Sequence, residues 1–265
     1  MAPDASQTDI DGAAGAVPPI GRRRALSLIA GLGAATLAAC GGRSSGGDAA
    51  GGDGDAIPTE TAGPYPGDGS NGPNVLAQDR VVRRDIRSSF GSASAVADGV
   101  PLTVELTIVD AGEDGVDDST PLPGAAVYLW HCNRAGEYSM YSQGVADENY
   151  LRGVQEADGE GRLGFTTVFP GAYSGRWPHI HFEVFASLAE ATGGGTPIAT
   201  SQIALPKDTC ALVYASDGYD QSVRNMERTS LESDNVFGDD GGVDQLATVT
   251  GKVRDGLVAS LTVPV

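Results

Sequence analysis

Residues 170–185 read PGAYSGRWPHIHFEVF, a Pro-Gly bend followed by a strand-like run that carries two histidines. Successive side chains of a strand point to opposite faces, so His179 and His181 project from one face and Ile180 from the other. Two imidazoles on one rigid strand can chelate a metal ion, and the pair uses two of the chain's three histidines. A lone His-x-His motif is weak, since paired histidines on a half-buried strand can also be polar surface.

Further strand-like runs flank this stretch on both sides. Apolar and β-branched residues are concentrated at 102–109, 127–130, 163–168 and 180–185, with weaker runs at 201–205 and 246–253. Gly, Pro and Asp separate these runs, which is typical of short strands joined by turns. We therefore predict an all-β fold, a β-sandwich, with helices only near 81–88 and 221–232.

Five segments, taken in order, resemble the intradiol ring-cleavage dioxygenases, the non-haem iron enzymes that open catechols between their two hydroxyls. They are ETAGPYP (60–66), VVRRDIR (81–87), PLPGAAVYLWHCNRAGEYS (121–139), DGEGRLGFTTVFPGAY (158–173) and GRWPHIHFEV (175–184). Any one segment is a weak motif, but the set spans about residues 59–215. The resemblance implies the β-sandwich of that family and its chemistry.

The resemblance also implies a ferric site with four protein ligands. Tyr138 and Tyr173 match the family's tyrosine ligands, and His179 and His181 match its histidine ligands. Ferric iron is a hard cation that anionic oxygen donors hold in its oxidised state, and coordination removes the proton of a tyrosine whose free pKa is about 10. The neighbouring aromatic residues are expected to be packing residues, with paired hydroxyls on the tyrosines: Tyr128, Tyr141, Tyr150, Trp130 and Trp177.

The same resemblance implies an oxidoreductase that cleaves a catechol-type ring with O2 to a muconate-type product. Catechol would displace Tyr173, which can then accept a catechol proton. Arg176 matches the arginine that stabilises negative charge on the substrate, and Gln202 resembles a glutamine that lies behind the ligands. Tyr65 is placed at the pocket mouth. Which catechol is the substrate stays open, and no basic residue is evident to pair with the carboxylate of protocatechuate.

Two other interpretations stay open at this point. His179, His181 and Glu183 share a strand face and could form an Fe(II) triad, although three ligands in one extended row span too far to cap one ion easily. The segments PLPGAAVYLW and DGEGRLGFTTVFPGAY also resemble the non-catalytic β-sandwich modules that accompany carboxypeptidases and carbohydrate-active proteins. Such a module requires neither Tyr138 nor Arg176 nor the histidine pair, and their joint presence favours the enzyme.

The first 40 residues have the composition of an export signal. Arg22-Arg23-Arg24 precedes an apolar stretch that ends at Leu37-Ala38-Ala39-Cys40 and is shorter than the about 20 apolar residues of a spanning helix. The arginines resemble a twin-arginine signal, and the end resembles a lipoprotein box in which Cys40 carries a lipid. The alternative is an ordinary secretory cleavage near Ala39. We therefore expect an exported, extracytoplasmic protein attached to the membrane only through a lipid on Cys40.

Residues 41–56 are rich in Gly, Ser and Asp and are expected to be a flexible tether, and residues 57–265 to form one catalytic domain. The formal net charge of −18 repels nucleic acid, so we predict no nucleic-acid partner. With Cys40 lipidated, Cys132 and Cys210 are left either as a disulfide or as two buried thiols. His131 is expected to be structural or on the surface, and the oligomeric state stays open.

Overall fold

The structure is a computed structural model, and it describes residues 56–112 and 120–265. The strands within these residues are β1 (Pro101–Val109), β2 (Ala126–Trp130), β3 (Arg152–Glu156), β4 (Arg162–Val168), β5 (His179–Phe185), β6 (Ala199–Ala204), β7 (Thr248–Lys252) and β8 (Gly256–Pro264). The helices are α1 (Leu188–Gly193), α2 (Lys207–Tyr214) and α3 (Asp220–Met226). The expected export signal (1–40), and the expected tether (41–56) except its last residue, lie outside the described residues.

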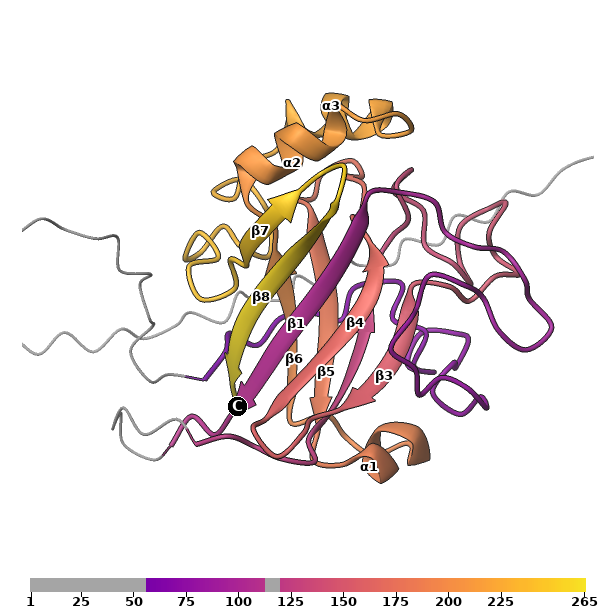
Figure 1. Ribbon diagram of the computed structural model, residues 1–265, viewed down its shortest axis with the longest axis vertical. Coiled ribbons are helices and arrows are strands. Elements are labelled where there is room, and N and C mark those ends of the chain that lie inside the picture. The colour runs from indigo at the N-terminus through magenta and orange to yellow at the C-terminus, as the bar shows by residue number, and fades with distance from the viewer. Residues whose placement is uncertain (1–55, 113–119) are drawn as a thin grey trace, which may run out of the picture. The chain divides into compact units, whose positions relative to one another are not determined.

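These strands form two four-stranded sheets that pack as a β-sandwich (Figure 1). One sheet has the order β4-β1-β8-β7, in which β1 is antiparallel to β4 and parallel to β8. The other sheet has the order β3-β2-β5-β6, and its strands are antiparallel throughout. Helices α2 and α3 lie at one end of the sandwich and α1 at the opposite end (Figure 1). The predicted all-β sandwich is confirmed.

The hydrophobic core lies between the two sheets, and strand alternation selects its residues. On β1, Leu102, Val104 and Leu106 face the core, whereas Glu105 between them is exposed. Phe182 of β5 is fully buried in the same core. Truncating a side chain of this kind to alanine costs about 3–5 kcal/mol, because the site cannot collapse fully around the cavity.

The outer face of the β3-β2-β5-β6 sheet is buried as well. Every residue of β2 and of β5 is buried, which alternation against a single core does not explain. A second apolar cluster covers this outer face: Val75, Leu76, Val81, Phe90, Ala126, Tyr128, Trp130, Cys132, Tyr138, Val154, Phe185 and Ala191. Side chains on the outer face of β5 therefore lie in a dry and rigid setting between two layers of protein.

Each of the predicted strand-like runs corresponds to an observed strand, whereas β3 and β8 were not predicted. β3 (RGVQE) has no apolar pattern of its own, and β8 is specified by its parallel pairing with β1. The helix expected at 81–88 is wrong, because Val82 bridges Val154 and Asp85 bridges Thr166 along the edges of the two sheets. The helix expected at 221–232 is confirmed in part by α3, and α1 and α2 were not predicted.

The two described cysteines are free thiols and not a disulfide. Both are buried, Cys132 in the outer-face cluster and Cys210 in the central core. The Cys132 thiol donates to the carbonyl of Gly171 at 3.3 Å. Of the two possibilities that the sequence left open, the structure therefore has the pair of buried thiols.

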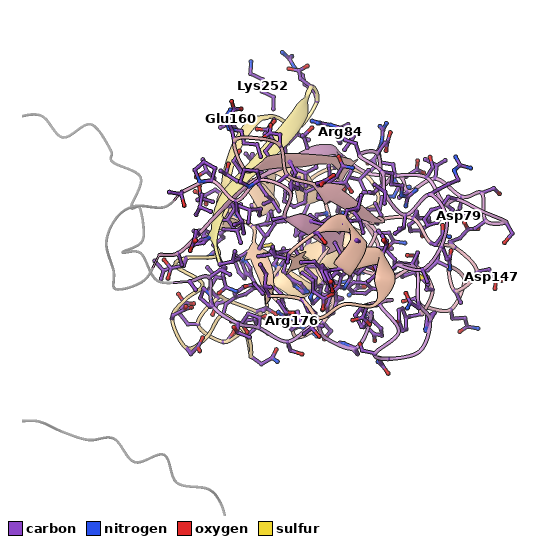
Figure 2. The ribbon with its side chains drawn as sticks, turned by 90° about the horizontal axis from the view of Figure 1, so that it is seen from below. Asp79, Arg84, Asp147, Glu160, Arg176 and Lys252 are labelled. Atoms are coloured by element: carbon purple, nitrogen blue, oxygen red, sulfur yellow. The ribbon has the colours of Figure 1, made fainter. Side chains whose placement is uncertain are left out.

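Charged side chains lie mainly on the surface. Asp79, Asp147 and Glu160 are exposed and point away from the fold (Figure 2). Negative charge at these positions is therefore solvated. Within the described residues no helix has the length and apolar character needed to cross a membrane.

Candidate metal centre

β5 carries the histidine pair in the arrangement that its sequence predicts. His179 and His181 project from the outer face of the strand and are each 2% exposed, while Ile180 packs in the central core. β5 is hydrogen-bonded to β2 on one side and to β6 on the other, so its backbone is fixed on both edges. The two Nε2 atoms lie 3.1 Å apart and point to the same place.

Two loops bring the tyrosines to this place. Tyr138 follows β2 through a loop in which Asn133 accepts hydrogen bonds from the backbone N–H groups of Ala135 and Glu137. Tyr173 lies beyond the bend at Gly171, whose N–H donates to the Asn133 carbonyl at 3.0 Å and so joins the two loops. The hydroxyl oxygens of Tyr138 and Tyr173 lie 3.4 Å and 3.1 Å from His179 Nε2.

The spacing of these four donor atoms fits a single metal ion. Ligands held at about 2.0–2.1 Å from a metal, at angles between a right angle and the tetrahedral angle, lie roughly 2.8–3.4 Å from one another. The observed separations from His179 Nε2 are 3.1 Å, 3.1 Å and 3.4 Å. Two neutral nitrogens and two phenolic oxygens also match the preference of ferric iron for hard oxygen donors beside imidazole.

Protonation states in the metal-free protein suit metal binding. Burial lowers the pKa of His179 to about 3 and that of His181 well below its ordinary value, so both imidazoles are neutral at pH 7. His179 Nδ1 lies 2.5 Å from the Trp177 carbonyl and donates to it, which leaves the Nε2 lone pair free. Burial raises the pKa of Tyr173 to about 12 and that of Tyr138 well above its ordinary value, so each stays a phenol until a cation displaces its proton.

Arg176 and Gln202 lie together beside the histidines. Arg176 Nη2 donates to Gln202 Oε1 at 2.6 Å, and Gln202 Nε2 donates to the carbonyl of Thr61 at 2.8 Å. Gln202 faces His181 across the β5–β6 pair, which explains why a residue so distant in sequence arrives here. The structure thus brings together all six residues that the sequence predicted for the site.

Sequence reasoning missed Asp234. Its carboxylate is buried and accepts from Arg176 Nε at 2.9 Å and from the backbone N–H of Trp177 at 2.6 Å. Asp234 lies in an irregular segment without a motif, so the sequence contains no local sign of this role. Only the packing of that segment against the end of β5 brings it to the arginine.

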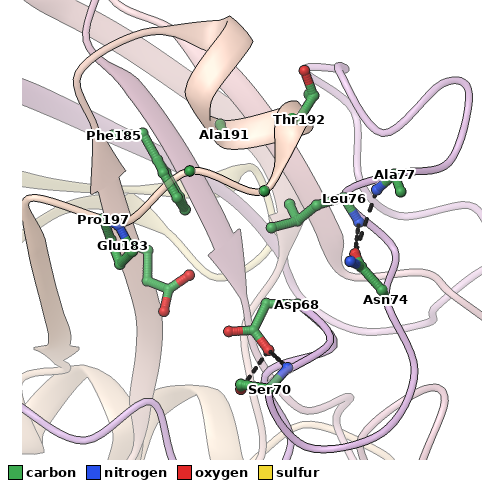
Figure 3. Close-up of a pocket in the computed structure, with 13 residues that line it drawn as sticks. Asp68, Ser70, Asn74, Leu76, Ala77, Glu183, Phe185, Ala191, Thr192 and Pro197 are labelled. Atoms are coloured by element: carbon green, nitrogen blue, oxygen red, sulfur yellow. Dashed lines mark hydrogen bonds between the residues drawn. The ribbon is translucent and has the colours of Figure 1, made fainter.

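Glu183 does not join the two histidines. Its carboxylate lines a cavity of about 350 Å³ together with Asp68, Ser70 and Phe185 (Figure 3), and none of the residues that line this cavity is a tyrosine. Burial, reinforced by the negative charge of Asp68, raises the pKa of Glu183 to about 7. Among the described residues no group of three or more His, Cys, Asp or Glu side chains is placed to hold a metal ion. The Fe(II) triad of His179, His181 and Glu183 is therefore not formed.

The remaining aromatic residues take structural positions. Tyr65 is half-buried, and its ring centroid lies 4.8 Å from that of Tyr138. The hydroxyls of Tyr128, Tyr141 and Tyr150 are all hydrogen-bonded to protein groups. His131 is structural, since its ring nitrogens pair with the Cys132 carbonyl and the Thr167 hydroxyl.

Comparisons with known proteins bear on the family of this chain. Residues 92–192 match the Dioxygenase_C family model, described as Dioxygenase. The chain is 30% identical over 115 residues to catechol 1,2-dioxygenase 2 of Acinetobacter lwoffii, covering 34% of this chain and 42% of that protein. It is 33% identical over 103 residues to the protocatechuate 3,4-dioxygenase beta chain of Burkholderia cepacia, covering 35% and 43%. These matches support the intradiol dioxygenase family.

The matched region contains Tyr138, Tyr173, Arg176 and both histidines, whereas Gln202 and Asp234 lie beyond it. The chain spans less than half the length of each of these two curated relatives. An intradiol ring-cleavage dioxygenase from Tetranychus urticae has a similar solved structure, with a TM-score of 0.62 and 24% identity over 79% of this chain and 94% of that one. At this identity the structural likeness shows that the fold is shared.

Proposed function

We propose that this protein is an Fe(III)-dependent intradiol dioxygenase, which cleaves a catechol-type ring with O2 to a muconate-type product. The observation that carries the proposal is that the hydroxyl oxygens of Tyr138 and Tyr173 and the Nε2 atom of His181 all lie within 3.1–3.4 Å of His179 Nε2. A non-catalytic β-sandwich module has no need of these four donors beside one another, and the desolvation of the three buried ones, Tyr138, His179 and His181, would be a pure cost to it.

Tyr138, Tyr173, His179 and His181 would hold the iron. When bound, ferric iron supplies a Lewis acid that draws electron density out of a catechol ring and makes the ring reactive toward O2. The protein's part is to keep four donors at fixed positions in a site from which water is largely excluded. Both histidines and Tyr138 are at most 2% exposed, which strengthens every charge interaction there.

The two tyrosines differ in exposure, and this separates their roles. Tyr138 is 1% exposed and packs in the outer-face cluster, whereas Tyr173 is only half-buried at its edge. Tyr173 therefore has room to swing away when a substrate arrives, and its phenolate oxygen can then take a proton from a catechol hydroxyl. Tyr138 stays in place and keeps the site assembled.

Arg176 supplies fixed positive charge beside the site. Its guanidinium is held at Nε by Asp234 and at Nη2 by Gln202, so it is oriented before substrate binds. A preoriented cation stabilises the negative charge that develops on a substrate carbon and oxygen without the cost of reorganisation during the reaction. Gln202 contributes by positioning Arg176 and by anchoring the Thr61 segment to β6.

The experiment that tests the proposal is a visible absorption spectrum of the iron-loaded protein, before and after catechol is added under argon. We expect a broad tyrosinate-to-iron charge-transfer band that moves to longer wavelength with catechol. Tyr138→Phe and Tyr173→Phe should each weaken and shift the band, while Tyr219→Phe, a buried tyrosine of the central core, should leave it unchanged. A colourless protein that binds no metal would contradict the proposal and favour the binding module.

We also propose that the protein is exported and is anchored by a lipid on Cys40. Support comes from the sequence of residues 21–40, which lie outside the described residues. The test is fractionation of cells that express the full chain or its Cys40→Ser variant. We expect the full chain in the membrane fraction and the variant in the soluble extracytoplasmic fraction; equal distribution of the two would contradict the lipid anchor.

A further inference from the structure

We infer that Trp130 is a positioning residue for the metal ligand His181, and that it fixes the imidazole by stacking in place of a hydrogen bond. The inference rests on the proposed metal centre and adds to it. It arises from a difference between the two histidines, which lie two residues apart on one strand but are held by different means.

The ring of His179 is held by a hydrogen bond, and the ring of His181 is not. His179 Nδ1 lies 2.5 Å from the carbonyl of Trp177. His181 Nδ1 is buried, and no protein group among the described residues lies within hydrogen-bonding distance of it. A histidine ligand ordinarily donates its remote N–H to a carbonyl or carboxylate, which sets both tautomer and ring orientation. Some other contact must set the orientation of His181.

Trp130 provides that contact. Its ring lies parallel to the His181 imidazole within 3°, with 4.9 Å between ring centroids. The two residues are direct partners across the β2–β5 pair, so the sheet itself brings the rings together. Rotation of the imidazole about its Cβ–Cγ bond would break the parallel contact and drive the edge of the ring into the indole face, which is fully buried and cannot retreat.

A third ring, that of Tyr128, supports the stack of Trp130 on His181. Tyr128 lies against Trp130 with ring centroids 4.9 Å apart and an interplanar angle of 20°. The Tyr128 hydroxyl donates to the Pro66 carbonyl at 2.7 Å and accepts from Arg152 Nη1 at 3.1 Å. Trp130 is thereby held in its orientation, and the stack runs along β2 from the anchored Tyr128 to Trp130 and then crosses to His181 on β5.

The backbone of Gly63 bounds the same imidazole near its metal-binding end. A Cβ atom added to Gly63 would lie 3.2 Å from His181 Cε1 and 3.7 Å from Nε2, and the residue has a φ of +71°. Glycine is therefore required there both for the backbone conformation and for the space. Trp130 fixes the plane of the imidazole and Gly63 lies along the edge that carries Cε1 and Nε2, and in this arrangement Nε2 lies 3.1 Å from His179 Nε2.

The first test needs no metal. The chain has three histidines, so the full chain labelled with 15N-histidine gives three ring spectra by NMR. In the metal-free Trp130→Leu variant we expect exchange broadening or a second conformer for His181 alone. His131 and His179 should stay sharp, because hydrogen bonds hold their rings. Trp130→Phe, which keeps a flat ring at the position, should restore a single His181 conformer.

The second test is titration of the full chain with ferric iron, followed by the charge-transfer band. We expect Trp130→Leu to weaken binding about 10- to 100-fold, the range typical when the support of a metal ligand is removed, and Trp130→Phe to recover most of the loss. Phe165→Leu, an equally buried aromatic in the opposite sheet, is the control and should bind iron like the wild type. Gly63→Ala should weaken iron binding without creating a cavity in the core.

A folded Trp130→Leu variant with a sharp His181 spectrum and wild-type iron affinity would overturn the inference. If Trp130→Leu does not fold, the same comparison of Trp130→Phe and Gly63→Ala with wild type decides it. If the wild type binds no ferric iron, the proposed function fails, while the NMR comparison still shows whether Trp130 orients His181.

Discussion

Asp234 shows how a single buried carboxylate sets the geometry of the candidate site. Burial acts to raise its pKa, but hydrogen bonds from Arg176 and from the backbone N–H groups of Trp177 and Val236 outweigh this and hold the pKa below its ordinary value. The carboxylate is therefore ionised at neutral pH. Its negative charge orients Arg176, and it also ties the loop before β5 to the segment around residue 234.

Asp234→Asn should therefore reduce both activity and stability. The amide leaves Arg176 without a counter-charge, and breaking a buried pair in this way costs about 3–5 kcal/mol, measured as the free energy of unfolding in urea. We expect kcat/KM for catechol to fall about 100-fold, because the guanidinium loses its fixed orientation. Asp98→Asn, which removes an exposed partner of Arg134, is the matched control and should change little. Equal effects of the two substitutions would contradict the role of Asp234.

The buried side chain of His131 should make the stability of the folded protein depend on pH. Burial lowers its pKa in the folded protein to about 4, whereas the unfolded chain has a histidine pKa of about 6.5. Because the folded pKa is the lower one, unfolding takes up a proton, and stability falls as the pH is lowered from about 6.5 to about 4. His131→Gln should make the dependence of the unfolding free energy on pH shallower in that window. An unchanged slope in the variant would show that His131 is not responsible.

At the scale of elements, the site depends on how two loops meet, and Gly171 is their point of contact. A Cβ added there would lie 2.5 Å from the Arg134 carbonyl oxygen, so the loop that carries Tyr173 touches the loop that leads to Tyr138 backbone to backbone. Strands β2 and β5 supply a rigid base, and this contact sets the separation of the two hydroxyls above it.

Gly171→Ala should force the two loops apart. We expect a loss of about 1–3 kcal/mol in the free energy of unfolding, as for other overpacked positions, and a weaker tyrosinate-to-iron band in the iron-loaded protein. The matched control is Gly159→Ala, at a turn where an added Cβ meets no atom within 4 Å. If the band is the same in both variants, the loop contact does not set the tyrosine positions.

At the scale of the whole molecule, the two layers that bury β5 also bury the cysteines. Burial raises the pKa of Cys132 to about 12 and that of Cys210 higher still, so both thiols are protonated and unreactive in the fold. In the Cys40→Ser chain without reductant, we expect a thiol reagent to label no cysteine in the native protein and two after unfolding in urea. Absence of labelling in urea would indicate a Cys132–Cys210 disulfide.

The sequence by itself determined the strand period and the shared face of the histidine pair. Alternation along 179–185 placed both histidines on one face, and that arrangement needs nothing beyond the geometry of a strand. The runs that became β1, β2, β4 and β5 were likewise predictable, because each has an apolar pattern of its own. The tyrosine ligands could be chosen only through the resemblance to a family, since a tyrosine in a loop has no periodic pattern.

Only the tertiary structure decided which distant residues complete the site. Asp234, Trp130 and Gly63 reach the centre by segment packing, cross-strand register and a close backbone approach, and none of these has a local sequence pattern. The extended conformation of residues 81–88 could not be predicted from the sequence for the same reason, because these residues bridge to the edges of other strands. Local periodicity records which face of an element is buried, whereas the partner that buries it depends on contacts between residues far apart in the chain.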